Sequence, residues 1–181
     1  LDDLGSATGY NMALYSRTLN GKTEWALASA GTADLVDVGS DIGQIEGGSN
    51  QYAFSVKFAR SLQNGMGGQE MTEVGHSLGG GLAAANSLAT GNAAITFNPA
   101  GVSWGTRMVN DLPKDKRDGQ IRSFVVGGEA VDRSQRLMGS SANGRITYIN
   151  PQYGIINKGA ALLLRFSTDI ITSVKYHMMS T

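Results

Sequence analysis

The chain has 181 residues, of which 41% are hydrophobic and 17% are charged, values ordinary for a globular protein with a buried core. Fifteen basic and fifteen acidic residues cancel to a formal net charge of zero, so no basic excess predicts a nucleic-acid partner. Cysteine is absent, which excludes a disulfide framework and a thiolate metal site.

The chain contains no run of 18 apolar residues, so no transmembrane segment is expected. No linker or internal repeat divides it, which predicts a single domain over residues 1–181. Because the sequence begins Leu-Asp-Asp without a methionine, we expect the domain to be processed or excised from a longer chain.

The first predicted unit is a β-hairpin made of residues 10–19 and 23–30. The two segments flank Asn20-Gly21, the dipeptide most typical of a two-residue hairpin turn. Residues 51–63 fit both a strand alternation and a helical stripe. Their length and their Ala, Lys, Arg and Leu content favour a helix, with Ser49-Asn50 as its N-terminal cap.

Later segments predict an alternation of strands and helices. Residues 93–98 indicate a buried strand stopped by Pro99, and 121–126 and 145–149 indicate two more strands. Residues 159–176 are expected to be mostly helical. This order predicts an α/β fold with a largely parallel sheet, whose ligands bind outside the carboxyl ends of the strands.

Residues 75–79 read Gly-His-Ser-Leu-Gly, the G-x-S-x-G pattern of a nucleophile elbow. A tight strand-to-helix turn would raise the Ser77 hydroxyl from the sheet edge, and Gly75 and Gly79 would leave room that a Cβ would fill. The helix starting after Ser77 would aim free backbone N–H groups at a developing anion. Small residues dominate positions 80–85, which favours close packing of that helix under the sheet.

The strand before the elbow, expected to end at Val74, does not read like a buried parallel strand. Such strands are usually continuous apolar runs, whereas residues 70–74 read Glu-Met-Thr-Glu-Val. Either the strand is only half covered, or Glu73 lies at its edge.

A serine nucleophile needs a base, and histidine suits this role because its pKa lies near neutrality. The chain has only two histidines. His76 adjoins Ser77, and its side chain should point away from the hydroxyl, which favours a packed structural role. His177 is therefore the candidate base.

The base needs a carboxylate to orient it, and in elbow enzymes the chain order is Ser, acid, His. Glu129 and Asp132 are preferred because they follow the 121–126 strand at its carboxyl end. The other acids between the nucleophile and the base lie in a charged loop or in the predicted last helix: Asp111, Asp115, Asp118 and Asp169.

Charge developing on a substrate carbonyl would be stabilised by backbone N–H donors. The amide of Leu78, which follows the nucleophile, is one candidate. A second donor usually follows an earlier strand, and Gly31-Thr32 ends the 23–30 segment. We therefore expect the Thr32 amide to be the second oxyanion donor.

Taken in order along the chain, these motifs resemble the class 3 lipase family of α/β-hydrolases. They are most similar to the lipase-like domains of bacterial polymorphic toxins and secreted effectors. The matching stretches are AGT at 30–32, GHSLGG at 75–80, FNPAG at 97–101, VVGGEAV at 125–131 and the terminal His177.

The resemblance has consequences for the site. In that family the acid lies in a D-x-V pattern, which Glu129-Ala130-Val131 matches with glutamate in place of aspartate. Glu129 is therefore the favoured acid and Asp132 the alternative. The resemblance implies a serine esterase acting on lipid esters, with a phospholipase A1-type activity, an acyl-serine intermediate and no metal or other cofactor.

The resemblance also implies secretion or delivery into a target cell, and a cognate immunity protein as partner. Asp34, Asp37 and Asp41 could bind calcium but are more simply a surface loop. Residues 159–164 could line an acyl pocket, although a core helix is the simpler interpretation. The alternatives in function are another serine acyl hydrolase (thioesterase, peptidase or acyltransferase) and a non-catalytic binding module on the same scaffold.

Overall fold

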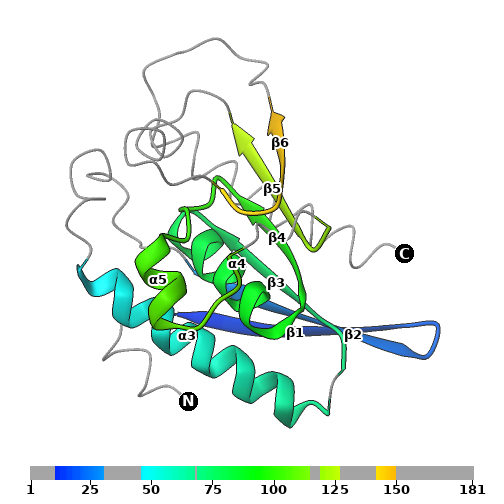
Figure 1. Ribbon diagram of the computed structural model, residues 1–181. Coiled ribbons are helices and arrows are strands. Elements are labelled where there is room, and N and C mark those ends of the chain that lie inside the picture. Colours follow the sequence, from blue (N-terminus) through cyan, green and yellow to red (C-terminus); the bar gives the residue numbers. More distant parts are fainter. Residues whose placement is uncertain (1–10, 31–45, 68, 115–118, 127–141, 150–181) are drawn as a thin grey trace.

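The computed structural model describes residues 11–30, 46–67, 69–114, 119–126 and 142–149 (Figure 1). Their elements, in chain order, are β1 (Met12–Leu19), β2 (Lys22–Ser29), α3 (Glu46–Gly65), β3 (Met71–His76), α4 (Leu78–Thr90), β4 (Ala93–Phe97), α5 (Trp104–Val109), β5 (Ile121–Val126) and β6 (Arg145–Ile149).

The six described strands form one sheet in the order β1-β2-β3-β4-β5-β6. β1 pairs with β2 antiparallel, and every later neighbour pair is parallel. Helix α4 packs against β2, β3 and β4, and α3 packs against α4, so both helices cover the same face of the sheet (Figure 1). The predicted α/β fold with a largely parallel sheet is confirmed.

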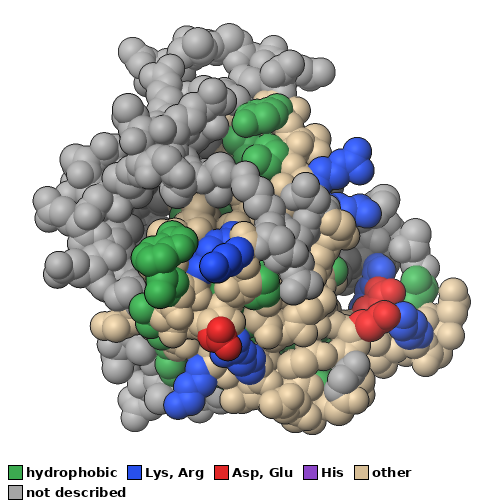
Figure 2. All heavy atoms as spheres, in the orientation of Figure 1, with side chains coloured by type: hydrophobic (Ala, Val, Ile, Leu, Met, Phe, Trp, Pro, Cys, Tyr) green, Lys and Arg blue, Asp and Glu red, His purple; other side chains and the backbone are tan. Residues whose placement is uncertain are grey.

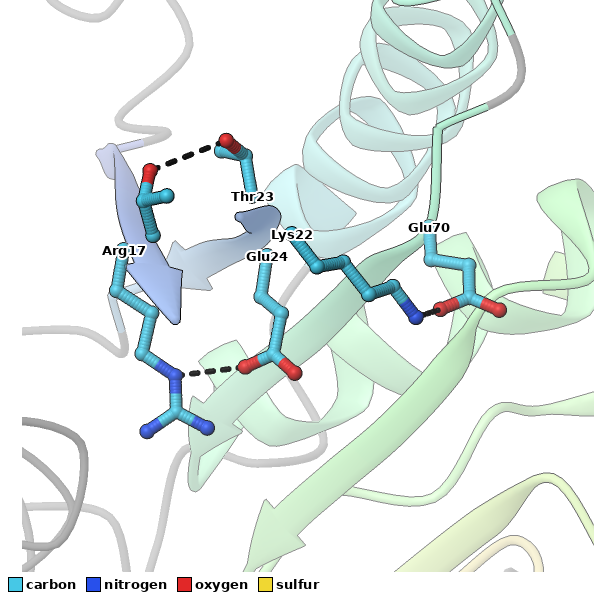
Figure 3. Close-up of polar contacts among 6 residues, drawn as sticks. Arg17, Lys22, Thr23, Glu24 and Glu70 are labelled. Atoms are coloured by element: carbon cyan, nitrogen blue, oxygen red, sulfur yellow. Dashed lines mark hydrogen bonds and ion pairs between the residues drawn. The ribbon is translucent and has the colours of Figure 1, made fainter. Parts of the chain in front are cut away.

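The predicted N-terminal hairpin is present, and its turn has the expected backbone. Asn20 and Gly21 both have positive φ, at 50° and 79°, as a two-residue hairpin turn requires. Cross-strand pairs reinforce the register, because Arg17 Nε donates to Glu24 Oε2 at 2.6 Å. Lys22 Nζ on β2 donates to Glu70 Oε2 just before β3 at 2.7 Å, so polar contacts also join the hairpin to the rest of the sheet (Figure 3).

Two predicted boundaries are wrong. Helix α3 begins at Glu46, so Ser49-Asn50 lies inside the helix and is not its cap. Gly47 and Gly48 have poor helix propensity, which hides the first turn from sequence reasoning, but a nucleated helix can extend through them. Strand β3 runs to His76 rather than ending at Val74, because pairing with β4 continues as far as His76 and Phe97.

The main hydrophobic core lies between α3, α4 and the strands beneath them. Leu82 and Ile121 have exposed fractions of 1% and 0%, so core packing reaches from α4 to β5. The buried cluster consists of Tyr52, Val56, Leu82, Ala84, Ala85, Leu88, Ala94, Val102, Leu112 and Ile121. The alanines allow α4 to approach the sheet closely.

Glu73 is completely buried in the middle of β3, so of the two alternatives for this strand the edge position is wrong, while the half-covered strand agrees with the burial on its two faces. It faces α4 together with Met71 and Gly75, while the alternate residues of β3 are half-buried. The Nδ2 groups of Asn86 and Asn92 donate to its two carboxyl oxygens at 3.3 and 3.4 Å. The strand breaks the apolar rule because Asn86 on α4 and Asn92, just after α4, supply amide partners for the carboxyl group.

Within the described ranges, no helix combines the length and apolarity needed to cross a membrane. The predicted helix at 159–176 lies outside the described residues.

Candidate active site

Ser77 occupies the single position between β3 and α4, at the carboxyl end of a central strand. Its backbone angles are φ 56° and ψ −124°. A positive φ is unfavourable for a residue with a Cβ, and residues held in such conformations cluster at functional sites. The elbow predicted from the sequence is therefore present in the backbone.

Three backbone hydrogen bonds hold this strained turn. The Ser77 amide donates to the carbonyl of Phe97 at 3.0 Å, at the end of β4. The Ser77 carbonyl accepts from the amides of Ala100 at 2.8 Å and Gly81 at 3.1 Å. Ser77 is thus fixed both by its own helix and by the chain that leaves β4.

The two outer glycines of the motif allow the turn to close. A Cβ on Gly75 would lie 2.1 Å from the carbonyl oxygen of Gly79. A Cβ on Gly79 would lie 2.2 Å from the carbonyl oxygen of Ser29 and 2.7 Å from the carbonyl carbon of Ala30. No real side chain fits these spaces, so the elbow packs directly on the carboxyl end of β2.

This contact bears on the two predicted oxyanion donors. Leu78 is the first residue of α4, where backbone N–H groups have no partner within the helix. Thr32 itself lies outside the described residues, and Ala30 is the last described residue before it. The last described residue before the predicted second donor therefore lies beside the elbow.

His76 is the last residue of β3 and is half-buried. Strand alternation places it with Thr72 and Val74 on the sheet face opposite α4. Burial lowers the pKa of its imidazole, so the neutral form is favoured. The structural role predicted for His76 stays a prediction, and the described residues provide no second histidine to compare with it.

Asn98 links two strand ends near Ser77, a role that the sequence did not predict. It entered the sequence comparison only as part of the FNPAG stretch at 97–101. Its Oδ1 accepts a 2.7 Å hydrogen bond from the Val126 amide, at the last residue of β5. Its own amide donates to the Phe124 carbonyl at 2.8 Å, and its φ is 40°. An Asn-Pro pair directly after a strand was the available signal, because asparagine tolerates positive φ and bonds nearby backbone.

The bonds of Asn98 join the end of β5 to the chain that holds the elbow. The carboxyl ends of β2, β3, β4 and β5 therefore lie along the same edge of the sheet as Ser77. The remaining predicted site residues lie outside the described residues: Glu129, Asp132 and His177, together with Asp34, Asp37, Asp41 and the stretch 159–164.

Comparison with known proteins agrees with this geometry. The family model of the Tle-like phospholipase domain matches residues 1–172. An extracellular phospholipase A1 from Serratia liquefaciens is 45% identical over 130 residues, which are 68% of this chain and 39% of that protein. The chain thus spans about two fifths of the length of this relative. The predicted lipase-like family is confirmed, and the chain belongs to the family of Tle-like phospholipase domains.

Proposed function

We propose that the domain is a serine phospholipase of the A1 type, which cleaves the ester of a membrane phospholipid through an acyl-serine intermediate. The observation that carries this proposal is the backbone of Ser77, held at φ 56° between a central strand and a helix. Such strain persists only where the surroundings enforce it, and here it presents a hydroxyl at the sheet's carboxyl end.

In the proposed reaction, Ser77 Oγ attacks the ester carbonyl while the imidazole of His177 accepts its proton. His177 then protonates the leaving glycerol oxygen, releasing a lysophospholipid and leaving the acyl group on Ser77. Water deprotonated by His177 hydrolyses the acyl-enzyme and frees the fatty acid. Glu129, or in its place Asp132, would orient the imidazole and stabilise its cationic form.

The amides of Leu78 and Thr32 would hold the oxyanion formed in both steps. The start of α4 at Leu78 and the packing of Gly79 on Ser29 and Ala30 support this assignment. The link from Asn98 to Val126 supports an acid that follows β5, because it ties that strand end to the elbow.

Covalent labelling tests the nucleophile. A fluorophosphonate probe is expected to label the wild-type protein, and Ser77→Ala should abolish labelling and lower hydrolysis by at least about 10³-fold. Ser61→Ala is the matched control, since Ser61 is exposed on α3 and its loss should leave labelling intact. Labelling that persists in Ser77→Ala would refute the assignment.

Product analysis tests the type of phospholipase. Vesicles of a phospholipid with different acyl chains at sn-1 and sn-2 are expected to release the sn-1 fatty acid and leave a 2-acyl lysophospholipid. Release of the sn-2 chain would contradict the A1 assignment, and release of a phosphorylated head group would contradict ester cleavage by an acyl-serine route.

We further propose that the domain acts as a secreted antibacterial effector with a cognate immunity protein. The Serratia relative is an extracellular phospholipase A1, which supports secretion. Directing the domain to the periplasm of a bacterial host should inhibit growth, and Ser77→Ala should relieve that inhibition. Equal growth of both strains at matched expression would contradict the effector role.

A further inference from the structure

Helix α5 presents an unusual group of exposed apolar side chains. The exposed fractions of Trp104, Met108 and Val109 are 70%, 59% and 77%, and no residue of this helix is buried. Figure 2 shows hydrophobic side chains gathered at the surface over α5, with Lys and Arg side chains beside them. Exposed apolar residues scattered singly are normal, whereas three within six residues indicate an interaction surface.

The exposure of these side chains is not the result of a loosely attached helix. Ser103 caps α5 by accepting the Thr106 amide at 3.1 Å. From the same helix, the guanidinium of Arg107 donates to the Pro113 carbonyl and to Asn143 Oδ1, which precedes β6. On either side of α5, Val102 and Leu112 belong to the buried core. The helix is therefore tied to the body of the domain while its apolar side chains point outward.

The α5 surface lies near the nucleophile. The Ala100 amide donates to the Ser77 carbonyl at 2.8 Å, and Trp104 follows Ala100 by four residues. Four residues of extended chain span at most about 14 Å, so α5 starts at the Ser77 end of the sheet. A membrane that contacts α5 would thus lie close to the Ser77 hydroxyl.

The charges around α5 are mostly positive. Arg60 of α3 donates to the Asn110 carbonyl at 3.2 Å, which brings α3 beside the end of α5. In residues 51–67 and 100–114, the cationic side chains are Lys57, Arg60, Arg107 and Lys114, and the only acid is Asp111. Lys57 and Lys114 are exposed. Cations beside exposed tryptophan complement the phosphates and the interfacial region of an anionic bilayer.

We propose that α5 is the surface through which the domain binds an anionic phospholipid bilayer, a role that rests on the proposed phospholipase function. Trp104, Met108 and Val109 enter the interfacial region, and Lys57 and Lys114 contact lipid phosphates. The bilayer is thereby held at the end of the sheet where Ser77 meets the substrate ester.

Vesicle binding by the full chain tests this surface, with Ser77→Ala as background so that the lipid is not consumed. The chain has two tryptophans, so Trp25→Phe leaves Trp104 as the sole tryptophan reporter. On phosphatidylglycerol vesicles its emission should shift to shorter wavelength and be quenched by brominated acyl chains. Phosphatidylcholine vesicles should bind more weakly.

Sedimentation with phosphatidylglycerol vesicles then compares variants. Trp104→Ser with Met108→Ser should weaken binding by about tenfold or more. Lys57→Ser and Lys114→Ser should each weaken it about fivefold, and high salt should remove this difference. Tyr15→Ser is the matched control, because Tyr15 is 58% exposed on β1, an edge strand of the sheet, and its loss should not change binding.

Three results would overturn the proposed surface: unchanged Trp104 emission at saturating vesicle binding, equal weakening by Tyr15→Ser, or a dimer in solution that the α5 double variant dissociates. Because vesicle binding is measured on the Ser77→Ala background, a loss of binding says nothing about the role of Ser77. Likewise, a wild-type protein that binds vesicles through α5 but resists fluorophosphonate labelling would refute only the proposed phospholipase.

Discussion

Glu73 carries an ionisable carboxyl group into the centre of the sheet, four residues before Ser77. Burial raises its pKa to about 7, while the amide hydrogen bonds from Asn86 and Asn92 oppose this shift. Asn86 is itself held by Ser55, whose Oγ donates to Asn86 Oδ1 at 2.7 Å. The carboxyl therefore belongs to a buried polar network joining α3, α4 and β3.

This shifted carboxyl predicts a specific pH dependence of stability. The folded-state pKa of Glu73, about 7, exceeds the unfolded value of 4.5, so between these values the folded protein binds more protons. The contribution of Glu73 to the free energy of unfolding is complete below pH 4.5 and is lost as the pH rises through 7. The loss is about 3 kcal/mol at most. Urea unfolding should therefore give a lower free energy of unfolding at pH 8 than at pH 5, and Glu73→Gln should reduce this difference.

Glu70→Gln serves as the matched control for this experiment. Glu70 lies three residues away on the surface, and its hydrogen bond and ion pair with Lys22 lower the pKa of its carboxyl. It is therefore mostly ionised between pH 5 and pH 8 in both states, and its removal should change the pH dependence of the unfolding free energy very little. If Glu73→Gln kept the wild-type difference in unfolding free energy between pH 5 and pH 8, Glu73 would not be the group responsible.

At the scale of elements, the ends of β4 and β5 are joined by one side chain. Asn98 accepts from the Val126 amide, and the predicted acid at position 129 follows Val126 by three residues. Deeper in the sheet, the hydroxyls of Thr96 and Ser123 lie 2.8 Å apart and join the same two strands. Substitutions at Asn98 and Thr96 therefore compare a hydrogen bond near Ser77 with a hydrogen bond in the core, both between β4 and β5.

We predict that Asn98 positions the catalytic acid. Asn98→Gly keeps a residue that accepts φ 40° but removes the acceptor, so kcat should fall about tenfold with little change in KM. Because a loosened acid stabilises the cationic imidazole less, the acidic limb of the kcat/KM profile should shift to lower pH. Asn98→Asp keeps both the acceptor and a tolerance for positive φ, and should restore the rate and the profile.

Thr96→Val separates this positioning role from general weakening of the strand pair. It removes a buried hydroxyl contact between β4 and β5 and should lower the free energy of unfolding by about 1–3 kcal/mol. Its pH–rate profile should match that of the wild type. If Thr96→Val shifted the profile as Asn98→Gly does, the role of Asn98 would be stability alone.

At the scale of the whole molecule, the helices and the sheet share one core. The two tryptophans lie on different elements, Trp25 on β2 and Trp104 on α5. In the sheet, β3 and β4 come next after β2. Core residues from α3, α4, β4, β5 and the chain flanking α5 form a single buried cluster. Such continuity favours a cooperative unit rather than separately unfolding parts.

Two single-tryptophan variants test this cooperativity. Trp25→Phe reports unfolding at α5, and Trp104→Phe reports unfolding at β2. Fluorescence-detected urea transitions of the two should have midpoints that coincide with those from circular dichroism of the same variant. In Trp25→Phe, a fluorescence midpoint at lower urea than the circular dichroism midpoint would contradict a single cooperative unit. It would mean that α5 opens on its own, despite the hydrogen bonds from Arg107 to Pro113 and Asn143.

Local signals were sufficient for much of the fold and for the strand-to-helix turn at Ser77. Asn20-Gly21 sets its hairpin because few residues adopt two consecutive positive φ angles, and the G-x-S-x-G spacing sets the elbow because both outer positions must lack a Cβ. Alternating strand and helix patterns were enough for a parallel sheet. These features depend on backbone sterics within a few residues.

Other features depend on partners distant in the sequence, and only the tertiary structure decided them. Glu73 looks misplaced until Asn86 on α4 and Asn92 after it provide amide donors. Strand β3 reaches His76 only because β4 pairs with it, and Asn98 finds its hydrogen-bond donor only because β5 lies alongside. The exposure of Trp104 likewise follows from how Arg107 anchors α5. Burial and hydrogen-bond partners are properties of packed surfaces, so a pattern along the chain does not determine them.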